Sequence, residues 1–248
     1  MSENKFPSEV IDLPSEGKLY PEGSPLREGK IEVKYMTAKE EDILTSQNLI
    51  KKGLVIEKLL DSLILTKGVK SEDLIIGDKN AVMVAARILA YGPEYACEVT
   101  NPNTGEKFTH TFNLADCPFK KLPDDLKGNK FEFELPISKT KIEFKLLTGK
   151  EETIINKEIQ QIKKLGDIVS RELTTRLKHT IISVDGESDT TTIRNFVDTL
   201  LSRDSLALRN EITRITPDIE MKQEVEFAGG ETVEVDIPLT ATFFWPNS

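Results

Sequence analysis

The chain alternates between two spacings of apolar residues, one typical of helices and one typical of strands. Apolar positions three or four residues apart predict helices in five segments, which are 54–65, 78–91, 151–180, 192–201 and 204–215. Alternation of apolar with polar residues predicts a strand at 31–36 and hairpins at 94–114, 131–147 and 220–239. Helices and antiparallel hairpins in one chain predict an α+β fold.

Polar residues mark where the helices begin and end. Thr37 followed three residues later by Glu40 is a capping box, so a helix is predicted to start there and to break near 46–48 and at Gly53. Asp78 and Asp204 are predicted to cap the helices that follow them.

The order of elements repeats along the chain. In each half a helix leads into a glycine-containing loop, an Asp-capped helix and a hairpin, and Asp78 lies 27 residues before Gly105 while Asp204 lies 26 before Gly230. An old duplication and chance similarity both explain this echo. We expect two similar helix-plus-β-hairpin lobes with an extended N-terminal arm. The predicted divisions are 1–36 for the arm and first strand, 37–122 for the first lobe, and 123–248 for the second lobe.

The longest helical pattern, 151–180, lies in the second lobe. Its apolar stripe consists of Ile155, Ile159, Ile162, Val169 and Leu173. The spacing is heptad-like, but Gly166 interrupts it. A long core helix is the favoured interpretation, and a coiled coil that binds a partner is the alternative.

The N-terminal stretch LPSEGKLYPEG (13–23) combines turn residues with apolar anchors. Prolines and glycines predict bends, because proline fixes φ and glycine permits positive φ. The anchors Leu13, Leu19 and Tyr20 are candidate partner-binding residues. They dock either on the first strand of this chain or on a neighbouring subunit. Deletion of 1–23 is expected to leave a folded core and to weaken assembly.

Three consecutive aromatic residues, Phe243, Phe244 and Trp245, lie near the other end of the chain. Large aromatic side chains are frequent hot spots of protein interfaces, so these are also candidate partner-binding residues. The alternative is that they fold back on their own core.

Composition excludes several classes of function. Lys plus Arg total 33 and Asp plus Glu total 42, so the net charge is −9 and nucleic-acid binding is not expected. No run approaches the roughly 20 apolar residues of a membrane span, and the polar N-terminus does not resemble a signal peptide. Two cysteines, Cys97 and Cys117, indicate free thiols in a reducing cytosol.

No stretch of the sequence carries a recognisable catalytic, cofactor or metal motif. His110 and His179 lack cysteine or carboxylate neighbours at ligand spacing, and no HExxH, GxSxG or P-loop pattern occurs. We therefore assign no catalytic, cofactor-binding or metal-binding residue and expect no enzyme. A cell-wall hydrolase that uses two carboxylates is the less favoured alternative, because such pairs meet in space rather than in sequence.

Five stretches together resemble a known family. These are LPSEGKLYPEG (13–23), KYMTAKEEDILTSQNLIKKG (34–53), VDGE (184–187), SRDSLALR (202–209) and FFWP (243–246). They resemble the T4-type bacteriophage baseplate proteins, which are called baseplate hub subunits or hub assembly proteins. The resemblance is weakest around 118–150 and carries over no catalytic residue.

The resemblance implies a non-enzymatic part in forming or assembling the central hub of a contractile-tail baseplate. Other baseplate hub and tail proteins are the implied partners, and self-association is left open. The implied locations are the host cytoplasm during assembly and, for a retained subunit, the tail baseplate of the virion. An assembly chaperone for another tail protein, such as the tape measure, is the alternative.

Overall fold

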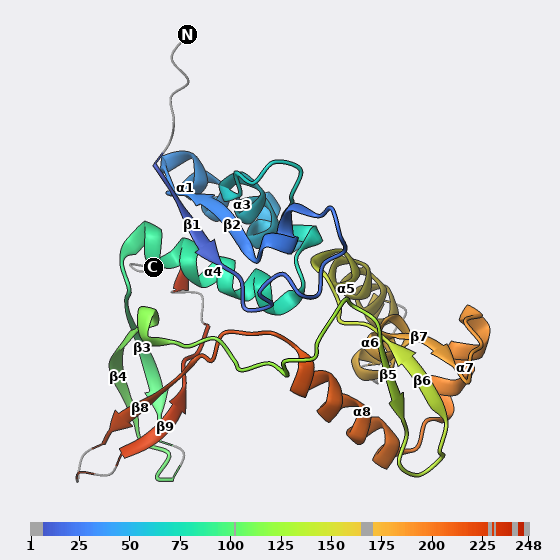
Figure 1. Ribbon diagram of the computed structural model, residues 1–248. Helices are drawn as coiled ribbons and strands as arrows, with labels where there is room; N and C mark the ends of the chain where they lie inside the picture. The colour runs from blue at the N-terminus through green and yellow to red at the C-terminus, as the bar shows by residue number, and fades with distance from the viewer. Residues whose placement is uncertain are drawn as a thin grey trace.

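The computed structural model describes residues 7–101, 103–164, 171–227, 230, 232–239 and 243–245. Helices alternate with small antiparallel sheets, which confirms the α+β fold class. Figure 1 groups the elements into an N-terminal lobe, a second lobe and a layer of two hairpins.

The N-terminal lobe surrounds a two-stranded sheet with helices. Its elements are β1 (Ser8–Asp12), η1 (Pro25–Glu28), β2 (Lys30–Lys34), α1 (Ala38–Thr45), α2 (Gln47–Lys52), α3 (Val55–Leu63), η2 (Ser71–Asp73) and α4 (Ile76–Tyr91). The predicted helix start after Thr37 and the predicted break at Gly53 are confirmed, with Gly53 in the left-handed conformation that ends α2. Leu59, Leu60 and Leu63 of α3 are fully buried, as their spacing predicts.

The predicted N-terminal arm docks on its own chain, the first of the two predicted surfaces, and in the described residues it is folded back rather than extended. Residues 8–12 form β1, which pairs antiparallel with β2, and residues 13–29 fold back through tight turns between the two strands. Gly17 is required in this bend, because a Cβ there would lie 2.3 Å from the carbonyl oxygen of Arg27. The segment is therefore part of the first lobe. The predicted bends and anchors of the arm are present, but its fold-back was not predicted because its contacts are made with residues distant in sequence.

The second lobe surrounds a three-stranded sheet with helices. Its elements are β5 (Phe131–Glu134), β6 (Lys141–Phe144), α5 (Gly149–Lys164), α6 (Glu172–Thr180), β7 (Ile181–Val184), α7 (Thr190–Thr199) and α8 (Ser202–Ile215). The predicted β5–β6 hairpin is confirmed, and β7 adds to it in the order β5-β6-β7. Strand β7 was not predicted, because its four residues IISV show no alternation of apolar and polar side chains.

The single long helix predicted over 151–180 is also wrong. Arg176 of α6 forms an ion pair with Glu152 of α5, and His179 Nε2 lies 3.0 Å from Glu158. One straight helix would hold Arg176 about 36 Å from Glu152, at 1.5 Å per residue. The segment therefore consists of two helices packed on each other. Ile155 and Ile159 of the predicted stripe are buried in α5, whereas Leu173 of α6 is exposed. Gly166 and Val169 lie outside the described residues.

Two hairpins form the third group of elements. They are β3 (Glu94–Thr100) with β4 (Lys107–Asn113), followed by η3 (Leu114–Asp116), and β8 (Lys222–Glu226) with β9 (Thr232–Asp236). Both were predicted, and they lie side by side (Figure 1). Phe108 packs edge-on against Phe227 at 4.9 Å, and the Tyr95 hydroxyl donates to the carbonyl of Pro238 at 2.9 Å. Because this layer joins both halves of the chain, the divisions at 36/37 and 122/123 stay predictions.

The predicted N-caps Asp78 and Asp204 lie inside their helices. Ile75 and Leu201 are the capping residues, and each aspartate is the third residue of its helix. Both aspartates are fully buried. Their carboxylates accept hydrogen bonds from backbone or hydroxyl donors of a distant segment and do not cap their own helix.

Candidate functional site

The three arm anchors lie in the core of this chain. Leu13 and Leu19 are 1% exposed and Tyr20 is 6% exposed. The Tyr20 hydroxyl donates to Asp78 at 2.6 Å and accepts from the Ile75 amide at 3.0 Å. Burial and the neighbouring Asp78 carboxylate raise the pKa of Tyr20 far above its usual range. In this fold the anchors fix the arm to its own lobe, and their role in binding a partner stays a prediction.

The C-terminal aromatic residues lie near the strand that follows the C-terminal end of α4, whereas the arm anchors lie near its N-terminal end. Phe243 and Phe244 are each 3% exposed, and Trp245 is partly buried against the core. The ring of Phe243 meets that of Tyr95 edge-on at 5.3 Å. The fold-back alternative therefore describes this conformation. Tyr20 contacts the start of α4 and Phe243 contacts the strand that follows α4, so the two predicted sets do not form one site.

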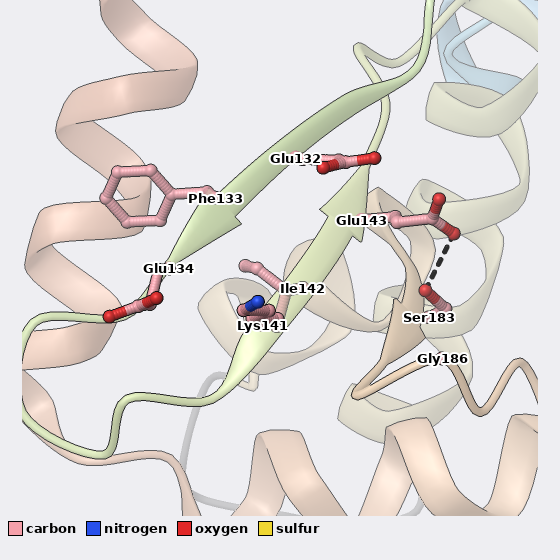
Figure 2. Close-up of a pocket in the computed structure, with 8 residues that line it drawn as sticks. All are labelled: Glu132, Phe133, Glu134, Lys141, Ile142, Glu143, Ser183 and Gly186. Carbon is pink, nitrogen blue, oxygen red and sulfur yellow. Dashed lines mark hydrogen bonds between the residues drawn. The ribbon is translucent and has the colours of Figure 1, made fainter.

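An open groove of about 530 Å³ lies over the β5-β6-β7 sheet. Its lining consists of Glu132, Phe133, Glu134, Lys141, Ile142, Glu143, Ser183 and Gly186. Figure 2 shows the Ser183 hydroxyl directed at Glu143, to which it donates at 2.7 Å. Lys130 Nζ also lies 2.6 Å from Glu143. Most of the lining residues are charged or polar, and Phe133 and Ile142, which lie opposite each other in the β5–β6 hairpin, are its apolar members.

The chemistry of this groove does not favour the carboxylate hydrolase. A glycosidase needs one carboxylic acid whose pKa is raised enough to protonate a leaving group. Hydrogen bonds from Lys130 and Ser183 instead lower the pKa of Glu143, because they stabilise its ionised form. The groove is better suited to polar contacts with another molecule than to proton donation.

Two further carboxylates are held ionised inside the lobes. Glu40 accepts from Lys34 at 2.8 Å, from Thr37 and from Ser62. Burial acts to raise the pKa of Glu40, but these hydrogen bonds outweigh it and lower the pKa to about 2. Glu151 accepts from Lys145 and Thr148 in the same way, and its pKa is also lowered to about 2. Glu151 was not predicted to be a functional or structural residue, although Thr148 three residues before it gives the capping-box pattern.

Asp78 is the carboxyl group whose pKa is raised, and burial is the main cause. One oxygen accepts from the Ser15 amide at 2.9 Å and the other from the Tyr20 hydroxyl. The side chain is fully enclosed, with no exposed surface for a substrate to reach. Asp78 is therefore a structural acceptor that joins the arm to α4.

The remaining candidates for chemistry are engaged in packing. The ring of His110 lies 4.7 Å from that of Phe112, and His179 pairs with Glu158. Cys97 and Cys117 are free buried thiols whose pKa is raised by burial. Across the part of the chain that the structure describes, no group of three His, Cys, Asp or Glu residues is arranged to hold a metal ion. In the same residues no helix is long and apolar enough to cross a membrane.

Comparison with known proteins identifies the family. No curated protein and no solved structure matches the chain. The family model described as T4 bacteriophage base plate protein matches residues 7–245, nearly the whole chain. The match includes both lobes, the hairpin layer and both sets of predicted anchors. The chain therefore belongs to the T4 bacteriophage base plate protein family.

Proposed function

We propose that this protein forms or promotes assembly of the central hub of a contractile-tail baseplate, through contacts with other baseplate proteins. The observation that carries the proposal is the match of the base plate family to residues 7–245. A non-enzymatic role is supported by the chemistry of the lobes. Glu40 and Glu151 are held ionised in internal hydrogen bonds, and Asp78 is enclosed.

The outer surface supplies places for protein contacts. Large apolar side chains are exposed on both lobes and the hairpin layer, among them Val10, Ile50, Leu201, Leu206 and Leu239. The polar groove over β5-β6-β7 adds Glu132, Glu134 and Lys141. A polar groove beside scattered apolar residues is typical of the mixed surfaces that proteins use in non-obligate interfaces.

An affinity purification from infected cells tests this proposal. We expect the tagged chain to retain a small set of baseplate proteins, including hub components, at salt concentrations that remove nonspecific contacts. A tagged cytosolic protein of similar net charge is the control. Retention of only host proteins, or of a tail protein that is not part of the baseplate, would contradict the proposal.

Mass spectrometry of purified virions separates the two forms of the proposal. A hub subunit is expected to be present in a fixed ratio to the other baseplate proteins. Absence from virions, together with retention of baseplate proteins in the purification, supports the assembly-promoting form. A chain that retains only the tape-measure protein and is absent from virions supports the chaperone alternative.

A further inference from the structure

The two lobes share a sequence repeat that is closer than the order of elements alone suggests. Residues 30–43 read KIEVKYMTAKEEDI and residues 141–154 read KIEFKLLTGKEETI, and nine of these 14 positions are identical. The repeat covers the second strand of each sheet, β2 or β6, and the start of the helix that follows it, α1 or α5.

The side-chain contacts of this repeat are also the same. Lys34 lies 2.8 Å from Glu40, and its counterpart Lys145 lies 2.7 Å from Glu151. The amide of the capping threonine donates to the same glutamate at 2.9 Å in both lobes. Two independent helix starts would not be expected to share a lysine partner, a capping threonine and these distances.

Residues outside the repeat make equivalent contacts as well. Leu-Pro follows the first strand of each sheet, at 13–14 and at 135–136. The amide of the next residue then donates to the buried aspartate of the last helix, Ser15 to Asp78 at 2.9 Å and Ile137 to Asp204 at 2.8 Å.

The sheets share their register too. Ile31 of β2 lies opposite Ile11, and the equivalent Ile142 of β6 lies opposite Phe133. On its other side β2 forms a bridge between Val33 and Ile64. The residue of β6 equivalent to Val33 is Phe144, which pairs with Ile181 of β7. These repeated contacts support an internal duplication, and they make β2 equivalent to β6, the start of α1 to that of α5, and Asp78 to Asp204.

A short β-bridge joins the first lobe to the second. The Ile76 amide donates to the carbonyl of Leu147 at 3.2 Å, and the Gly149 amide donates to the carbonyl of Leu74 at 2.9 Å. Gly149 permits this approach, because a Cβ there would lie 2.7 Å from the carbonyl oxygen of Ser71. We name Leu74–Ile76 the acceptor segment and residues 147–149 the docking segment.

Each lobe carries both segments, but in the part of the chain that the structure describes the bridge is made once, between Ile75 and Thr148. The equivalent of the acceptor segment in the second lobe is 200–202, and the equivalent of the docking segment in the first lobe is 36–38. Ile75 in the occupied acceptor segment is 1% exposed, whereas its counterpart Leu201 is 49% exposed. The second acceptor segment is therefore uncovered in the single chain.

The uncovered segment already has the bound conformation. The backbone of Ile75 has φ −61° and ψ 146°, and that of Leu201 has φ −62° and ψ 139°. The preceding residues agree as well, with ψ 136° at Leu74 and 126° at Leu200. A preformed segment binds without the cost of ordering its backbone.

We propose that copies of this protein associate head to tail, with 200–202 of one copy bound to 36–38 of the next. The amides of Ser202 and Ala38 are the first of α8 and α1, so neither has a partner inside its own helix.

The geometry of the contact determines the kind of assembly. The two surfaces differ from one another, so the contact is heterologous and produces a ring where the rotation closes, or an open chain where it does not. Within the chain the two lobes are covalently linked, which raises their effective concentration. Two separate copies lack this advantage. In addition, the Ala38 methyl group takes the place of the Gly149 hydrogen and hinders the close backbone approach. The association is therefore weaker than the internal contact and depends on concentration.

Sedimentation velocity of the full chain over a range of concentrations tests the proposal. The wild type is expected to self-associate, and Leu201→Asp to weaken the association at least about tenfold, the change that follows from a loss of about 1.4 kcal/mol. Ala38→Gly should strengthen it by restoring the glycine of the internal contact. Leu239→Asp is the matched control, because Leu239 is 48% exposed and lies outside both segments. Circular dichroism verifies that each variant is folded.

Cross-linking of mixed variants tests the orientation. Ala38→Cys chains mixed with Leu201→Cys chains should form disulfide-linked pairs, and neither variant should do so alone. Three results would overturn the proposal. They are a wild type that stays monomeric up to the highest soluble concentration, a Leu201→Asp chain that associates like the wild type, and cross-linking of Leu201→Cys with itself.

Discussion

Deletion of residues 1–23 is expected to destroy the cooperative fold of the N-terminal lobe. The deletion removes β1 and three side chains, Leu13, Leu19 and Tyr20, that are at most 6% exposed. At roughly 1.5–3 kcal/mol for each large buried side chain, the loss is at least about 5 kcal/mol, which is comparable to the whole stability of a domain. Urea unfolding followed by circular dichroism should show a lost or strongly shifted transition.

This expectation replaces the one drawn from the sequence alone, in which the same deletion leaves a folded core. The matched control is deletion of residues 1–6, which stops before β1 and should keep the wild-type unfolding midpoint. A chain without residues 1–23 that unfolds cooperatively at the wild-type midpoint would show that the arm is dispensable for folding.

Glu40→Gln is expected to have the largest effect of any single conservative substitution. The Glu40 side chain is fully enclosed and pairs with Lys34, whose side chain is 9% exposed. A pKa lowered from 4.5 to about 2 corresponds to about 3 kcal/mol of folding free energy at neutral pH. The amide keeps the shape of the carboxylate and removes its charge, so urea unfolding at pH 7 should show a loss of this size.

The Glu40 carboxylate also predicts how the free energy of unfolding changes with pH. Because the pKa of Glu40 is lower in the folded state, its contribution is complete above about pH 4.5 and is lost as the pH falls toward 2. Glu40→Gln should therefore unfold with a smaller pH dependence than the wild type between these values. Glu151→Gln is the control in the equivalent position. Its effect should be smaller, because the Glu151 side chain is 20% exposed. An unchanged pH profile in Glu40→Gln would contradict this assignment.

Local periodicity predicted the elements whose burial repeats regularly. The hairpins at 94–114 and 220–239 and the core helix α3 were predicted because each shows one apolar face. Thr37 and Glu40 predicted the start of α1 because the capping box is a local contact.

Features that depend on distant partners could not be predicted in this way. Tyr20 lies among turn residues, and its partner Asp78 is 58 positions away. Gly166 interrupted the apolar stripe of 151–180, but the apolar spacing resumed after it, so one long helix was favoured over two. Asp204 was predicted to be an N-cap because aspartate is common at that position. Its carboxylate instead accepts a hydrogen bond from the amide of Ile137, 67 positions earlier.

The repeat of 30–43 at 141–154 is visible in the sequence and assigns Glu151 to the same role as Glu40. Periodicity within one segment misses such a signal, because the repeat appears only when two stretches 111 residues apart are compared.

The most direct test of the central claim is electron microscopy of lysates from a phage in which the gene for this protein is disrupted. If the protein forms or assembles the baseplate hub, the lysates should contain heads and incomplete baseplates without attached tails, and expression of the wild-type chain should restore complete particles. Complete baseplates with normal hubs in the disrupted phage would contradict the account.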